Sequence, residues 1–159
     1  MIILGIDPGF DRMGCAVLEK SASSTDKLIY STCLVSNRKL SQEERLFSLG
    51  KKLEEIIKKY KPDIVAVEKL FFTKNQKTAL QVAEARGMVL YLASSKKIPV
   101  HSLTPLQIKI ALTGYGRAEK IQVQKMVMAI LGLKKKPKYD DEIDAIAAAI
   151  TCSASYPQL

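Results

Sequence analysis

The sequence has almost none of the side chains on which most nucleophilic and zinc-dependent enzymes rely. It contains one histidine, no tryptophan and three widely spaced cysteines. A Ser-His-Asp or Cys-His mechanism would need His101, which directly follows the predicted strand 98–100 and for which we expect a structural role. The odd set of Cys15, Cys33 and Cys152 fits no metal motif, so we expect reduced thiols in a cytosolic protein.

Long apolar runs are also missing. No segment approaches the ~20 apolar residues of a membrane-spanning helix, and the N-terminus enters a predicted strand without the basic region that begins a signal peptide. We therefore expect a cytoplasmic protein with no membrane partner. A length of 159 residues, of which 47% are hydrophobic and 26% charged, predicts one globular domain over residues 1–159.

Positive charge is in clear excess. The 25 lysines and arginines outnumber the 16 acidic residues, which gives a formal net charge of +9. Such a surface favours a polyanionic partner such as nucleic acid, because contacts with phosphate release counterions. The alternative is that the charge serves solubility alone.

The opening stretch places a carboxylate at the end of a predicted central strand. Ile2-Ile3-Leu4-Gly5-Ile6 leads directly into Asp7, and Pro8-Gly9 follows. A run that is apolar on both alternating faces indicates a strand buried on both sides, and the Pro-Gly pair would end it. Open α/β sheets bind their ligands at the carboxyl ends of such strands. The alternative is an aspartate that only begins a turn.

The next segments predict how the sheet continues. Residues 14–19 and 28–35 follow as strands joined by short turns, which favours an antiparallel arrangement with the first strand. Ser41 and Glu44 form a capping box that opens a helix, and Lys61-Pro62-Asp63 ends it. Residues 64–67 then predict a strand that runs into Glu68. Because a strand reached through a helix is usually parallel to the first, Asp7 and Glu68 should meet.

The second half of the chain is predicted to be mainly helical. The predicted elements are a long helix over 75–95, a strand over 98–100, a helix from Thr104-Pro105 to about Gly114, a helix over 118–131, a basic loop over 134–138 and a last helix from about Asp141. One side of the long helix carries small and apolar residues: Leu80, Ala83, Gly87, Leu90 and Tyr91. These elements predict an α/β fold. Its mixed sheet would have three antiparallel strands followed by parallel ones, and helices would flank it.

The last helix brings two more carboxylates to the predicted site. Asp141 and Asp144 are three residues apart, so they project from the same face of the helix. Acidic residues also stabilise helix N-termini through the dipole, which is the alternative role. With Asp7 and Glu68, the pair would give four hard oxygen ligands without histidine or cysteine, a set that suits Mg²⁺ or Mn²⁺ rather than zinc. Two such ions would relieve the repulsion between the carboxylates and would suit phosphodiester hydrolysis.

These motifs, taken together, resemble one family along nearly the whole chain. They are Leu4-Gly5-Ile6-Asp7-Pro8-Gly9, Ala66-Val67-Glu68, Asn75, Ala85-Arg86-Gly87, Gly116, Ala118-Glu119-Lys120, Gln122-Val123-Gln124 and Asp141-x-x-Asp144-Ala145. Their order and the chain length are similar to those of RuvC-type Holliday junction resolvases. The resemblance implies an RNase H-like fold, a homodimer, a branch-migration helicase as partner, and Mg²⁺-dependent paired nicks that resolve four-way DNA junctions in recombination and repair.

The resemblance also implies roles for individual residues. The four acidic metal ligands of the family match Asp7, Glu68, Asp141 and Asp144. The DNA-contacting positions of the family match Phe71, Lys109 and Lys120. Arg117 directly follows the loop Gly114-Tyr115-Gly116, and we expect it to contact DNA as well. Phe71 would stack on a base exposed at the crossover, although a hydrophobic staple onto the next helix is the alternative. Asp140 adjoins Asp141 and is the alternative ligand, but Asp141 keeps the three-residue spacing to Asp144.

Two other classes of protein share parts of this pattern. An actin-like phosphotransferase also follows a strand with an Asp-x-Gly loop, but it normally needs two similar domains to enclose its nucleotide, more than 159 residues supply. A non-catalytic junction-binding module would use the carboxylates only as helix caps. We expect the nuclease.

Overall fold

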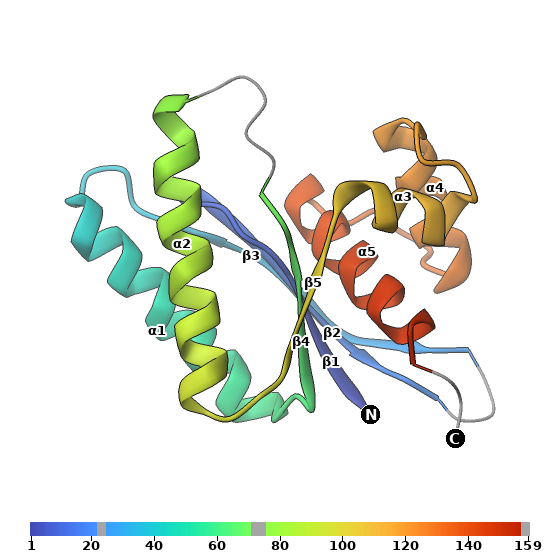
Figure 1. Cartoon of the computed structure of the whole chain (residues 1–159), viewed down its shortest axis with the longest axis horizontal. Coiled ribbons are helices and arrows are strands. Elements are labelled where there is room, and N and C mark those ends of the chain that lie inside the picture. Colours follow the sequence, from blue (N-terminus) through green and yellow to red (C-terminus); the bar gives the residue numbers. More distant parts are fainter. Residues whose placement is uncertain (22–24, 71–75, 157–159) are drawn as a thin grey trace.

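The computed structural model describes residues 1–21, 25–70 and 76–156, and its centre is a five-stranded sheet (Figure 1). The strands are β1 (Ile2–Asp7), β2 (Arg12–Glu19), β3 (Lys27–Val35), β4 (Ile64–Glu68) and β5 (Val100–Leu103). Their order across the sheet is β3-β2-β1-β4-β5. Neighbours among β1, β2 and β3 are antiparallel, whereas β4 is parallel to both β1 and β5. The mixed sheet predicted from the sequence is confirmed.

Helices cover both faces of this sheet. They are α1 (Gln42–Tyr60), α2 (Gln76–Ser95), α3 (Pro105–Thr113), α4 (Lys120–Ile130) and α5 (Asp140–Ala154). Figure 1 shows α1 and α2 on one side of the sheet and α5, with α3 and α4 outside it, on the other. Capping boxes at Ser41 and Thr104 begin α1 and α3, as predicted, and Pro105 occupies the first turn of α3.

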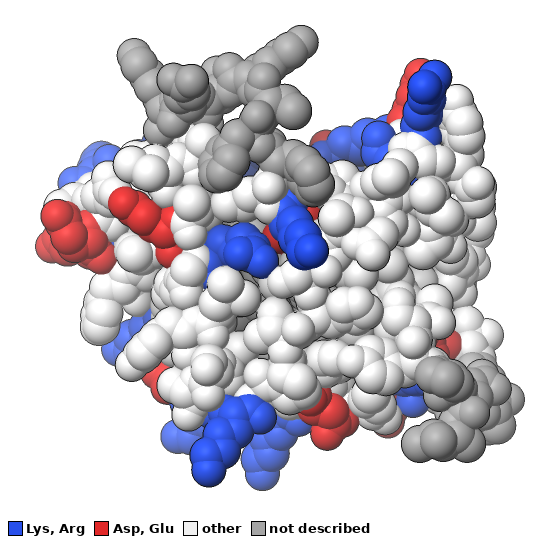
Figure 2. Space-filling view, in the orientation of Figure 1, with Lys and Arg blue, Asp and Glu red and all other residues white. Residues whose placement is uncertain are grey.

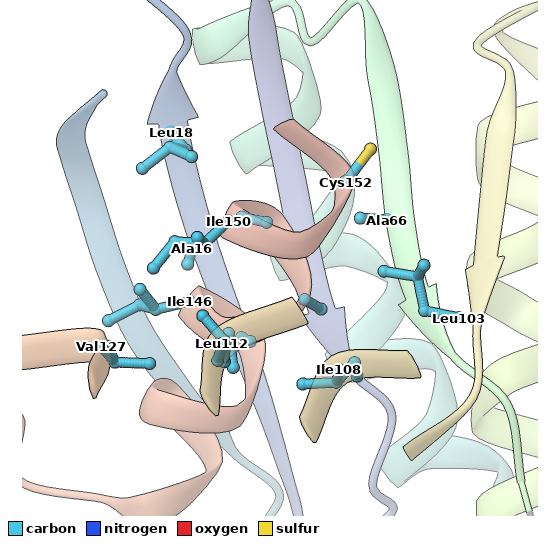
Figure 3. Packing of buried hydrophobic residues seen from close by; sticks show 14 of the residues in the cluster. Ala16, Leu18, Ala66, Leu103, Ile108, Leu112, Val127, Ile146, Ile150 and Cys152 are labelled. Atoms are coloured by element: carbon cyan, nitrogen blue, oxygen red, sulfur yellow. The ribbon is translucent and has the colours of Figure 1, made fainter. Parts of the chain in front are cut away.

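The alternating side chains of the central strands supply two hydrophobic cores. Leu4 and Ile6 pack beneath α1 and α2, whereas Ile3 belongs to the core beneath α5. Figure 3 shows this second core, in which Ile146 and Ile150 of α5 lie with side chains from the sheet and from α3 and α4. Because β1 is buried on both faces, its position and the direction of its carboxyl end are fixed by packing.

Helix α5 lies unusually close to the sheet. A Cβ atom added at Gly5 would come closer than 3.0 Å to the carbonyl oxygen of Ala145, and one added at Gly14 would come as close to that of Asp141. Alanines along α5 allow the same close approach from the helix side. The two glycines therefore allow α5 to lie directly against β1 and β2, with Asp141 near the carboxyl end of β1.

The packing of α2 differs from the apolar side singled out in the sequence. Among the side chains of this helix that the structure describes, those of Ala85, Val89 and Ala93 are buried, whereas Leu80 and Tyr91 are 69% and 71% exposed. Alanine and valine allow α2 to approach the sheet closely, so the larger apolar side chains are left facing outward.

Several boundaries also shift from those predicted. β2 begins at Arg12 rather than at residue 14, and β5 covers Val100–Leu103 rather than 98–100. The shift in β5 follows from its pairing with β4, in which Val65 lies opposite Val100 and Glu68 opposite Leu103. Within the described ranges, none of the helices has the length and apolar character needed to cross a membrane.

Candidate active site

Four carboxylates from three elements gather where β1 and β4 end. Asp7 and Glu68 are the last residues of these two parallel strands, and the pairing of Ile6 with Val67 puts them side by side. Asp141 and Asp144 come from the first turns of α5, which lies against β1 and β2. The structure therefore brings together the four acidic residues selected from the sequence.

The electrostatic state of the cluster shows how close these groups are. Burial, together with the charges of Asp144, Glu68 and Asp141, raises the pKa of Asp7 to about 8. Burial and the charge of Asp144 raise the pKa of Glu68 to about 7, although Lys120 and Lys109 oppose the rise. Four carboxylates cannot all be ionised here without compensating positive charge.

Two cations of the chain supply part of that compensation. Lys120 Nζ donates a hydrogen bond of 2.9 Å to Asp144 Oδ2. Arg12 Nε lies 3.2 Å from Asp141 Oδ2. Each α5 carboxylate in the cluster is thus paired with a positive side chain, one from α4 and one from β2.

The orientations of Asp140 and Asp141 are different. Asp140 is half-exposed and pairs with Lys136 at 3.0 Å and with Lys120 at 3.8 Å, and a hydrogen bond from Lys136 lowers its pKa. The Asp141 side chain is 19% exposed and adds to the negative potential at Asp7. Of the two neighbours, Asp141 is the one turned toward the carboxylate cluster.

The donor chemistry of the cluster fits a divalent cation that prefers oxygen ligands. Asp141 Oδ2 is buried and accepts no hydrogen bond within the described structure, so it retains a free coordination position. However, no three His, Cys, Asp or Glu side chains in the described ranges are close enough together to form a finished metal site. The carboxylates are near enough to raise the pKa of Asp7, and two of them are paired with Arg12 and Lys120. We conclude that the residues fit a metal but would have to converge on it.

Two of the four predicted DNA-contacting residues lie beside the carboxylate cluster. Lys109 and Lys120 line a pocket of about 190 Å³ together with Glu68, Asp144 and apolar side chains of α3, α4 and α5. Arg117 is exposed in the loop between α3 and α4. Phe71 lies outside the described residues. Figure 2 shows basic side chains at the middle of one face, beside a small acidic area.

Two arginines near the site were not assigned a role from the sequence. Arg12 was missed because nothing in the sequence pattern links the start of β2 with α5; only their packing does. Arg86 of α2 belongs to the motif Ala85-Arg86-Gly87, and this motif could have indicated a role for it. It donates hydrogen bonds to the Glu68 carbonyl oxygen (3.3 Å) and to Ser102 Oγ (3.1 Å), and so it joins the ends of β4 and β5 to α2.

Comparisons with known proteins agree on one family. Residues 3–152 match the family model described as crossover junction endodeoxyribonuclease RuvC. The chain is 49% identical to the crossover junction endodeoxyribonuclease RuvC of Desulforamulus reducens over 156 residues, which cover 98% of this chain and 94% of that protein. It is 46% identical to the RuvC protein of Petrotoga mobilis over 149 residues, 94% and 91% of the two chains.

A solved structure gives the same result in three dimensions. Thermus thermophilus RuvC in complex with a Holliday junction substrate superimposes with a TM-score of 0.89 at 34% identity, over 95% of this chain and 92% of that one. The RNase H-like arrangement of sheet and helices is therefore shared over nearly the whole chain.

Proposed function

Because the chain belongs to the RuvC family of crossover junction endodeoxyribonucleases, we propose that it resolves four-way DNA (Holliday) junctions by paired, symmetric nicks. It is a metal-dependent endonuclease of DNA recombination and repair. The observation that carries the proposal is the cluster of four carboxylates on a protein whose net charge is +9. A phosphodiester substrate suits this combination, since the basic surface attracts DNA and the acidic cluster can hold metal.

The metal that we propose is Mg²⁺, as two ions per site, with Mn²⁺ able to substitute. Asp7, Glu68, Asp141 and Asp144 would hold the ions. When bound, the ions would activate the attacking water and stabilise the charge on the leaving oxygen. The raised pKa of Asp7 and that of Glu68 mean that these residues give up protons as they become ligands.

The basic residues around the cluster would hold the DNA. Lys109 and Lys120 line the pocket beside Glu68 and Asp144, so they are placed to bind a phosphate there. We propose that Arg117 contacts the backbone further along, and that Phe71 stacks on a base of the opened crossover. The phosphate contacts would position the junction, whereas the stacked base would favour branched DNA over linear duplex.

The proposal of a homodimer rests on the family and on one exposed apolar surface. A junction presents two equivalent strands, so paired nicks need two active sites related by a two-fold axis. Phe47, Leu80 and Tyr91 are each at least 69% exposed on the neighbouring helices α1 and α2, where a second copy could cover them. We propose a cytoplasmic homodimer, with residues 1–159 as a single nuclease domain in each subunit and a branch-migration helicase as a further partner.

The test uses a synthetic four-way junction and a linear duplex, each with Mg²⁺, Mn²⁺ or EDTA. We expect symmetric nicks in the junction only, and only with metal. Asp7→Asn and Asp141→Asn should each lower the rate at least ~100-fold, on the scale of a damaged metal site. Asp140→Asn is the matched control, because it changes a half-exposed neighbouring carboxylate that pairs with Lys136 at 3.0 Å and with Lys120 only at 3.8 Å, and it should stay within a fewfold of wild type.

The alternative outcomes are distinct. Junction binding without cutting in either metal would leave a binding module, in which the carboxylates only stabilise helices. Equal losses in Asp140→Asn and Asp141→Asn would contradict the assignment of Asp141. The phosphotransferase considered from the sequence is set aside, since the family that matches residues 3–152 is one of endonucleases.

A further inference from the structure

Arg12 brings a positive charge to the edge of the carboxylate cluster, although no motif assigns it a role. It is the first residue of β2, and its Nε atom lies 3.2 Å from Asp141 Oδ2. Its side chain is 51% exposed, whereas that of Asp141 is 19% exposed. A half-exposed cation therefore pairs with a mostly buried anion.

The contact supplies charge without a hydrogen bond. Asp141 Oδ2 accepts no hydrogen bond within the described structure, even though Arg12 Nε is near. Lys120 is different, because it donates a hydrogen bond of 2.9 Å to Asp144. Of the two cation–carboxylate pairs, the one at Asp141 is thus held more weakly and leaves the oxygen's lone pairs available.

The backbone that carries Arg12 is well anchored. In the preceding turn, the Phe10 ring lies 4.2 Å from the guanidinium of Arg45 of α1, which also donates hydrogen bonds to Ser36 Oγ and Asp11. The guanidinium of Arg12 itself lies 5.7 Å from the centre of the Tyr139 ring. Arg12 therefore contacts this ring at about the distance of a cation–π interaction while it pairs with Asp141, so Asp141 is not its only partner.

Resting on the nuclease function proposed above, we propose that Arg12 is the resident counter-ion of Asp141 and that a divalent cation must displace it to enter the site. A positive charge beside the oxygen opposes the approach of a cation. Arg12 therefore offsets one negative charge of the metal-free cluster. It also raises the concentration of divalent cation that is needed to fill the site. It is a positioning residue for Asp141, not a metal ligand.

The test measures Mn²⁺ binding to the protein without DNA, from the electron paramagnetic resonance signal of the free ion. Arg12→Ala should bind Mn²⁺ roughly 3- to 10-fold more tightly than wild type, since one unit of opposing positive charge is gone. Arg12→Lys should stay near wild type. Arg38→Ala is the matched control: it removes the same charge from an exposed arginine paired with Asp11, and it should change nothing.

A double variant tests whether the effect passes through Asp141. In an Asp141→Asn background, Arg12→Ala should raise Mn²⁺ affinity by less than it does in the wild type, because no carboxylate remains at position 141 for Mn²⁺ to take from its counter-ion. Unchanged or weaker binding by Arg12→Ala alone would overturn the proposal, as would an equal gain in Arg38→Ala or no Mn²⁺ binding by any variant. Circular dichroism of each variant shows whether it is folded.

Junction cutting by the wild type, measured in parallel, separates this proposal from the function. If the wild type cuts junctions but Arg12→Ala leaves Mn²⁺ affinity unchanged, the counter-ion role alone is wrong. If Arg12→Ala binds Mn²⁺ more tightly but the wild type cuts no junction, the proposed function alone is wrong.

Discussion

At the scale of single residues, Asp7 links the stability of the protein to pH. Its ordinary pKa of 3.8 is raised to about 8 in the folded, metal-free protein, mainly by burial and then by the charge of Asp144. Between these two values the folded state holds a proton that the unfolded state releases. The contribution of Asp7 to stability is therefore fully present below pH 4 and is lost as the pH rises through 8. Glu68, with its pKa raised to about 7, acts in the same direction.

This predicts a specific stability profile for the metal-free enzyme. In EDTA, the free energy of unfolding of the wild type should fall between pH 5 and pH 8. Asp7→Asn should show a flatter profile and exceed the wild type at pH 8 by on the order of 1–3 kcal/mol, because its side chain never ionises. Urea unfolding at three pH values measures both.

Mg²⁺ should reverse the trend for the wild type, since the ion binds the deprotonated carboxylates. Parallel pH profiles for the wild type and Asp7→Asn in EDTA would show that the proton is not held at Asp7.

The residues of the site were predictable to different degrees. Asp7 and Glu68 could be found because each ends an apolar run, and parallel strands bring their carboxyl ends together. Asp141 required the three-residue spacing to Asp144. Arg12 could not be found, because its role depends on how closely α5 lies on β2, a distance that no periodicity in the sequence encodes.

At the scale of elements, the approach of α5 to the sheet decides where two of the carboxylates lie. Gly14→Ala should test this, since the new Cβ would overlap the carbonyl oxygen of Asp141. Helix α5 would have to move outward, at a cost of about 1–3 kcal/mol in unfolding free energy. The same movement would carry Asp141 away from Asp7, so junction cleavage should fall more than the loss of stability alone explains.

The control for this substitution is Gly87→Ala in α2. An added methyl group there meets nothing within 4 Å, and alanine is the better helix former, so stability should be unchanged or rise by up to about 1 kcal/mol. Chemical denaturation measures the stability of both variants, and single-turnover cleavage measures their activity. If Gly14→Ala matched the wild type in both, the position of α5 would not depend on this close contact.

The elements themselves show where sequence patterns stop being sufficient. The helical period predicted α2, but the helix has apolar residues on more than one side, and periodicity alone does not select the buried one. The sheet is covered by Ala85, Val89 and Ala93, which are small enough for close packing, and Leu80 faces outward. Caps were more predictable, because Ser41 and Thr104 act within four residues of their own chain.

At the scale of the whole molecule, that outward apolar side is the surface that we propose for dimerisation. Phe47 of α1 and Tyr91 of α2 are 73% and 71% exposed, an unusual exposure for large aromatic side chains on neighbouring helices. If a second copy covers them, a charge placed there must be buried without a partner when the dimer forms. Tyr91→Glu should therefore shift the protein from dimer to monomer in sedimentation velocity at micromolar concentration.

A control in the same assay is Ile110→Glu, which makes a similar change at a half-exposed residue of α3, away from α1 and α2. It should sediment as the wild type does. The Tyr91→Glu monomer should keep its affinity for Mn²⁺, because the carboxylates come from one chain, but it should lose the paired symmetric cuts that need two sites about a two-fold axis. A Tyr91→Glu protein that remains dimeric, or a wild type that is monomeric with and without junction DNA, would place the subunit interface elsewhere or remove it.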